Sequence, residues 1–182
     1  MNTSDRSVVQ IDSALRRRFA FIRVDTLLVS ESSDELKQLL LTSPNSTEFW
    51  SPDQRMTDAE GIFQSLFKLN EFLRENVGPD AMLGHSYLFD LKCCSQQATD
   101  EGEGEIGENC FWRAIRDMLL LSVYPQLADT IASNGVGDEH VVNINKFVDE
   151  LNSAVNIHLT EASKLGCNLK KPSSPFGQYR ME

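Results

Sequence analysis

The sequence predicts an α+β chain in which a helix and a strand precede a mainly α-helical bundle. Two observations support this class. Residues 7–18 repeat apolar side chains at helical spacing, and residues 19–24 (FAFIRV) form a short run rich in β-forming residues. After residue 32, longer segments repeat apolar side chains every three or four positions, as amphipathic helices do. We therefore expect a small helix–strand unit over residues 1–24 and a helical domain over residues 25–168.

The helical domain is predicted to begin near Ser32, because Ser32 and Glu35 fit a capping box. Residues 42–58 are rich in Pro, Ser, Asn and Asp, which favours a loop. Phe49 and Trp50 lie within this loop and are expected to anchor it to the core.

The longest helices are predicted over residues 59–76, 110–133 and 138–164, and Pro125 is expected to kink the second of them. Residues 84–91 are interpreted as a short loop and an extended piece. Residues 95–109 are acidic and glycine-containing, which predicts a mobile insertion. The tail over residues 169–182 is predicted to be disordered.

The net charge of −10 is unevenly distributed. Residues 1–24 contain five Arg and two Asp, whereas the rest contains 12 Lys or Arg and 25 Asp or Glu. This balance disfavours non-specific binding of duplex DNA by most of the chain. Neither a run of about 18 apolar residues nor a signal-peptide pattern occurs, so we expect a cytoplasmic protein without a membrane span. The four cysteines lack the spacing of a zinc site, and no metal is expected.

Two segments resemble one known family. Residues 1–7 (MNTSDRS) and 11–19 (IDSALRRRF) closely resemble the MNTADRS…DxALRRRF block of McrB-like AAA+ nucleoside-triphosphatases, the motor subunits of 5-methylcytosine-specific restriction. Residues 83–89 (LGHSYLF) are similar to the LGHSYF segment in the lid of that family. The resemblance implies that residues 1–24 end an AAA+ α/β core, that residues 25–168 form its helical lid, and that this chain is the C-terminal part only.

The resemblance assigns roles to Asn2 and Asp5. Asn2 is expected to be the sensor that orients water toward the γ-phosphate, since an amide both donates and accepts without adding negative charge. Asp5 follows on the same loop and is expected to help organise the site. The alternative for both residues is an ordinary loop with a helix N-cap.

Arg17 and Arg18 are expected to act in trans on the nucleotide of a neighbouring subunit, as arginine fingers do. Successive helical residues point about 100° apart, so the three arginines cannot all point one way, and Arg16 is expected to be the solvated or salt-bridged one. The alternative is a cationic helix end that only complements the helix dipole.

His85 and Ser86 match the lid segment and are expected to approach the nucleotide or the hinge between core and lid. The alternative is a packing role, and Tyr87 and Phe89 are expected to be core anchors.

The phosphate-binding machinery is missing from the sequence. No GxxxxGK[ST] motif and no strand ending in paired acidic residues occurs, so no hydrolysis is expected from this chain alone. GTP or ATP with Mg²⁺ is implied by the resemblance only. The expected partners are likewise implied by the resemblance only. The first is a P-loop-containing AAA+ subunit or a missing N-terminal half of this protein, and the second is an McrC-like nuclease. DNA is expected to be contacted only indirectly.

Met1 falls inside the sensor motif, from which we expect a truncated gene, a misassigned start codon or one part of a split gene. The first functional hypothesis is a fragment of a restriction motor. The alternatives are a non-enzymatic helical interaction module and an inactive truncated product.

Overall fold

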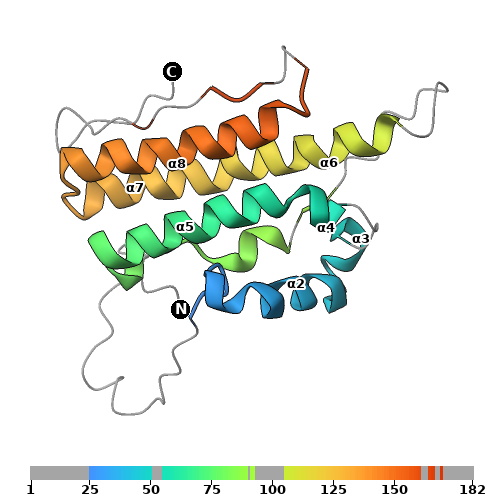
Figure 1. Cartoon of the computed structure of the whole chain (residues 1–182), viewed down its shortest axis with the longest axis horizontal. Helices are drawn as coiled ribbons and strands as arrows, with labels where there is room; N and C mark the ends of the chain where they lie inside the picture. Colours follow the sequence, from blue (N-terminus) through green and yellow to red (C-terminus); the bar gives the residue numbers. More distant parts are fainter. Residues whose placement is uncertain are drawn as a thin grey trace, which may run out of the picture.

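The computed structural model describes residues 25–50, 55–89, 91–92, 105–160, 164–166 and 169, without the side chains of residues 105–109. In this part of the chain the regular elements follow one another as helices (Figure 1). The α-helices are α2 (Ser33–Thr42), α3 (Thr47–Trp50), α4 (Arg55–Asp58), α5 (Glu60–Asn76), α6 (Glu105–Met118), α7 (Tyr124–Ser133) and α8 (Asp138–Asn156). The shorter turns are the 3-10 helices η1 (Ser30–Ser32), η2 (Pro79–Ala81) and η3 (His85–Leu88) and the π-helical turn η4 (Leu119–Val123).

The predicted α+β class is wrong, because no strand occurs in the residues that the structure describes. The helix and strand predicted over residues 7–18 and 19–24 lie outside those residues. The extended piece predicted over residues 84–91 contains the 3-10 turn η3 instead. A strand requires a neighbouring strand to bond its backbone. Here the Trp50 indole N–H donates to the Leu88 carbonyl at 2.9 Å, so a side chain provides a bond that a neighbouring strand would otherwise make.

The longest predicted helices are present with shifted ends. The third ends at Asn156 rather than Lys164. The second begins at Glu105, inside the acidic segment predicted as a mobile insertion. Glutamates in a first helical turn interact favourably with the positive end of the helix dipole, which gives a physical reason for the earlier start.

A kink was expected at Pro125, and the π-helical turn η4 joins α6 to α7 just before this residue. Pro125 lies in the first turn of α7 and has no backbone N–H to bond the carbonyl four residues earlier. A π-helical turn is a common way to accommodate such an interruption within a continuous helix.

Helix α5 forms the centre of the described bundle. Figure 1 shows α5 between α2 on one side and α6, α7 and α8 on the other, and α5 packs against α8. Burying one leucine or phenylalanine side chain stabilises a fold by about 1.5–3 kcal/mol. The large apolar side chains that α5 buries are Ile62, Phe63, Leu66, Phe67, Leu69 and Leu73.

The prediction that Phe49 and Trp50 anchor their segment to the core is confirmed. Both are buried, with 4% and 1% of their surface exposed. The Phe49 ring stacks on Phe111 of α6 at a centroid distance of 5.1 Å, and Trp50 lies 5.4 Å from the Phe63 ring of α5. The short helix α3 is therefore fixed to two longer helices by aromatic contacts.

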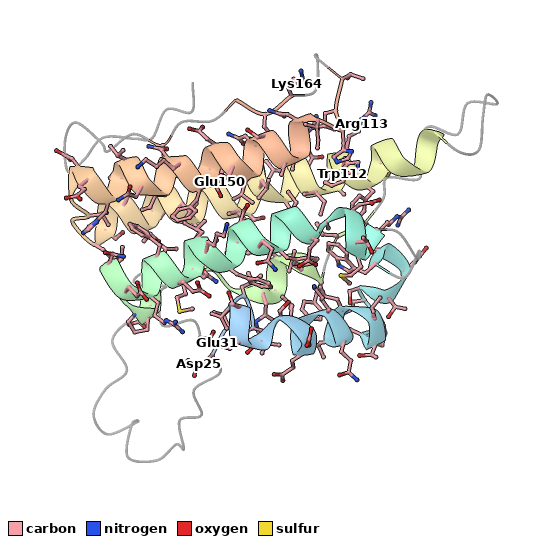
Figure 2. The ribbon with its side chains drawn as sticks, viewed as in Figure 1. Asp25, Glu31, Trp112, Arg113, Glu150 and Lys164 are labelled. Carbon is pink, nitrogen blue, oxygen red and sulfur yellow. The ribbon has the colours of Figure 1, made fainter. Side chains whose placement is uncertain are left out.

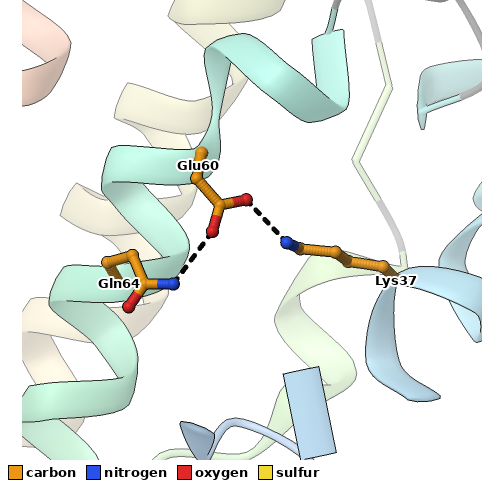
Figure 3. Close-up of polar contacts among 3 residues, drawn as sticks. All are labelled: Lys37, Glu60 and Gln64. Carbon is orange, nitrogen blue, oxygen red and sulfur yellow. Dashed lines mark hydrogen bonds and ion pairs between the residues drawn. The ribbon is translucent and has the colours of Figure 1, made fainter. Parts of the chain in front are cut away.

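A polar contact joins α2 to the first turn of α5 (Figure 3). Lys37 Nζ lies 2.6 Å from Glu60 Oε2, and Gln64 Nε2 donates to Glu60 Oε1 at 2.9 Å. The hydrogen bond from Lys37, followed by that from Gln64, lowers the pKa of Glu60. The contact is partly exposed, so it orients α2 more than it stabilises the fold.

Asn70 is the most deeply buried polar residue of α5. Its side chain is fully buried, and its Nδ2 donates to the carbonyl oxygens of Leu28 at 2.9 Å and Leu83 at 3.0 Å. Its Oδ1 accepts from the Leu83 N–H at 2.7 Å. We use the term leucine clasp for an asparagine side-chain amide that hydrogen-bonds both the N–H and the carbonyl of one leucine. The clasp on Leu83 fixes the segment before η3 to the central helix, and the bond to Leu28 fixes the segment before α2.

Replacing Asn70 with alanine is expected to lower the free energy of unfolding by about 3 kcal/mol or more, because three buried backbone groups lose their partners. Urea denaturation followed by circular dichroism measures this change. Asn76→Ala is the matched control on the same helix, since Asn76 is exposed and bonds only the Phe72 carbonyl. The control is expected to change stability by less than about 0.5 kcal/mol. Equal effects of the two substitutions would contradict the role assigned to Asn70.

Candidate functional site

The candidate site is the junction at which residues 25–28 meet η3. The backbone N–H of Leu27 donates to Nδ1 of His85 at 3.1 Å. The next residue, Leu28, bonds Asn70 through its carbonyl and Thr26 Oγ1 through its N–H, the latter at 3.2 Å. The chain that continues from residues 1–24 is thus attached to the bundle at two successive residues.

His85 is held as a neutral imidazole in this junction. Because Nδ1 accepts a hydrogen bond, the ring proton lies on Nε2, which remains a donor. The ring is half-buried and lies edge-on to Phe89 at a centroid distance of 5.9 Å. Burial lowers the pKa of His85 below its ordinary value. At neutral pH the site therefore offers one oriented N–H donor and no positive charge.

Ser86 differs from His85 although the two are adjacent. Its side chain is exposed, and its backbone carbonyl accepts from the Phe89 N–H at 3.1 Å. Of the two lid residues predicted from the sequence, His85 contacts the junction, whereas Ser86 faces solvent beside it.

Tyr87 and Phe89 pack against the core as predicted, and both are half-buried. The Tyr87 hydroxyl donates to the side-chain oxygen of Gln126 on α7, and burial raises the pKa of Tyr87. Gln126 Nε2 donates in turn to the Met82 carbonyl at 3.4 Å. The turn that carries His85 is therefore fixed from α7 as well as from α5.

The other predicted site residues are Asn2, Asp5, Arg17 and Arg18. All four lie outside the residues that the structure describes. Their roles as sensor and trans-acting residues stay predictions.

Asn70 is the residue of this junction that sequence reasoning missed. The sequence pattern that could have identified it is a single amide among the leucines and phenylalanines on the apolar face predicted for residues 59–76. A polar side chain at such a position requires hydrogen-bond partners when buried, which marks it as a structural or functional residue.

The described residues contain no group of three or more His, Cys, Asp or Glu side chains placed to hold a metal ion. A helix with the length and apolar character of a membrane span is likewise not found among them.

Comparison with known proteins links part of the chain to a restriction system. Over 97 residues, 52% of this chain, it is 30% identical to the "Type IV methyl-directed restriction enzyme EcoKMcrB subunit" of Escherichia coli (strain K12). The matched part spans only 18% of that relative's length. No family model and no solved structure matches the chain. The similarity supports a relationship to McrB and to restriction systems at this coarse level.

Acidification is expected to destabilise the chain partly through His85. The folded state keeps this imidazole neutral, so protonation favours the unfolded chain. The stability that the neutral His85 contributes is therefore fully present above the ordinary histidine pKa of about 6.5 and is lost as the pH falls below that value. His85→Asn supplies an amide oxygen that accepts from Leu27 without titrating. Urea unfolding at pH 7.5 and pH 5.5 is expected to show a smaller loss of stability in His85→Asn than in the native chain. An equal loss in both proteins would contradict a neutral, buried His85, because the remaining titrating groups are common to them.

Proposed function

We propose that this chain is the C-terminal part of an McrB-like AAA+ nucleoside-triphosphatase. It comprises the helical lid and the core segment that acts on a neighbouring subunit's nucleotide. The observation that carries the proposal is the 30% identity over 97 residues to the EcoKMcrB subunit. The junction adds support, because His85 of the lid-like segment LGHSYLF bonds Leu27, which lies eight residues after the second family-like segment ends at Phe19.

In this proposal Asn2 orients the attacking water and Asp5 helps to organise the site. Arg17 and Arg18 stabilise the charge that develops on the transferring phosphoryl group of the neighbour. The phosphates and Mg²⁺ are held by a P-loop outside this sequence, and the nucleotide is GTP or ATP. The energy released drives an McrC-like nuclease, so this chain contacts DNA only indirectly.

The hydrogen-bonding chemistry of His85 suits a position between the lid and the nucleotide. A neutral imidazole whose Nε2–H is oriented by the Nδ1 contact can donate one hydrogen bond to a phosphate, ribose or base oxygen. Ser86, exposed beside it, can add a hydroxyl. Because the same imidazole bonds Leu27, contact with the nucleotide would be transmitted directly to the chain that leads into the core.

The test is nucleotide hydrolysis by the 182-residue chain with GTP and with ATP, alone and mixed with a P-loop-containing McrB-like subunit. We expect no hydrolysis alone and stimulation of the partner. Arg17→Ala or Arg18→Ala is expected to reduce that stimulation at least about tenfold, because arginines acting in trans contribute up to about 10³–10⁵ in rate.

Arg16→Ala is the matched control, since it removes the same charge from the adjacent residue, which is expected to be solvated or salt-bridged. It should leave stimulation within about twofold of the native value. Hydrolysis by the chain alone, or equal loss of stimulation in all three variants, would contradict the proposed division of roles.

A further inference from the structure

Two further leucine clasps lie on α8. The amide of Asn145 donates to the Leu169 carbonyl at 2.8 Å and accepts from the Leu169 N–H at 2.8 Å. The amide of Asn156 makes the same pair of bonds to Leu165, at 2.9 Å and 2.7 Å. Each asparagine thereby bonds a backbone in the way that a neighbouring strand would, with one donor and one acceptor.

The two asparagines lie on one face of α8. They are eleven residues apart, which is close to three helical turns and about 16 Å along the axis. Two leucines four residues apart in a chain span at most about 14 Å. A peptide that engages both clasps must therefore be nearly extended, and it must run antiparallel to α8, since the later leucine pairs with the earlier asparagine.

Burial of the leucine side chains completes the contact. Leu165 and Leu169 have 7% and 6% of their surface exposed, and both belong to the apolar core. In an extended chain, side chains four residues apart point to the same side. One face of such a peptide therefore supplies two apolar anchors while the clasps take up its backbone groups.

Acidic side chains outnumber basic ones on α8, whereas lysines flank Leu165 and Leu169 in the sequence. Asp149 is exposed on the face of the clasps, one helical turn after Asn145, and Glu150 is exposed about 100° further round the helix. Lys164 precedes Leu165, and Lys170 and Lys171 follow Leu169 in the sequence. Figure 2 shows Glu150 on α8 and Lys164 on the segment that follows this helix.

We propose that this face of α8, marked by Asn145, Asp149 and Asn156, is a docking site for an extended basic peptide of a partner protein with two leucines four residues apart. The chain's own Leu165 and Leu169 occupy the site in cis. Because the clasps bond only backbone atoms, recognition depends on the leucine spacing and on flanking lysines. A partner segment with this pattern competes with the chain's own segment.

The cis segment gives a probe for the experiment. A fluorescein-labelled peptide of residues 163–171, with Cys167→Ser to prevent oxidation, is titrated against full-length chains by fluorescence anisotropy. The first chain is native, and the second carries Leu165→Ser and Leu169→Ser, which weaken the cis occupant. The third adds Asn145→Ala and Asn156→Ala to the second, and circular dichroism verifies that each chain keeps its helices.

We expect the second chain to bind at least about tenfold more tightly than the native chain, whose tethered segment competes at high effective concentration. The third chain is expected to bind at least about tenfold more weakly than the second, since it lacks both clasps. Equal binding by the second and third chains, or no binding by a folded second chain, would overturn the proposal.

A measurement on the native chain keeps the test independent of the variants. Excess unlabelled peptide is expected to speed amide exchange at Leu165 and Leu169, because it displaces them from α8. Unchanged exchange at millimolar peptide would overturn the proposal. A native dimer that becomes monomeric on Leu165→Ser and Leu169→Ser would also overturn it, by assigning the face to exchange between copies of this chain.

Discussion

The buried amide of Asn70 is the interaction on which the arrangement of the candidate site depends. A buried amide without partners destabilises a fold, so the Asn70 side chain requires backbone groups close to α5. Leu28 and Leu83 supply them, from segments that precede and follow α5 in the sequence. Leu27 and His85 are within two residues of these positions, and their mutual hydrogen bond follows from the same constraint.

This constraint has a consequence for movement in the proposed motor. Because residues 27 and 28 are bonded to η3 and α5, they move together with the helical bundle. Rotation of the lid relative to the core would then occur on the N-terminal side of Leu27. His85 stands at that boundary with its second nitrogen able to donate, so one residue can link nucleotide contact to lid position.

The helical bundle could be predicted from the sequence more fully than the candidate site could. Periodic leucines and phenylalanines predicted α5, and Phe49 and Trp50 were correctly expected to reach the core. The predicted α+β class is wrong for the described residues, which form helices, and the strand on which it rested, residues 19–24, lies outside them. The extended piece predicted over residues 84–91 failed because composition did not show that the Trp50 side chain would bond the backbone around η3. The three leucine clasps pair residues 9, 13 and 24 positions apart, which produces no periodic signal. The roles of Asn2 and the arginines rest on family likeness, and these residues lie outside the described part of the chain.

Amide hydrogen exchange of the native chain, resolved by residue with NMR, tests the central claim most directly. If the Asn70 clasp fixes the junction, the Leu83 amide exchanges as slowly as amides in the middle of α5, and the Leu27 amide is protected by His85. Exchange of both amides at the rate of an unstructured peptide, while α5 remains protected, would contradict it. That result would mean that the bundle folds without holding His85 against the chain that leads into the core.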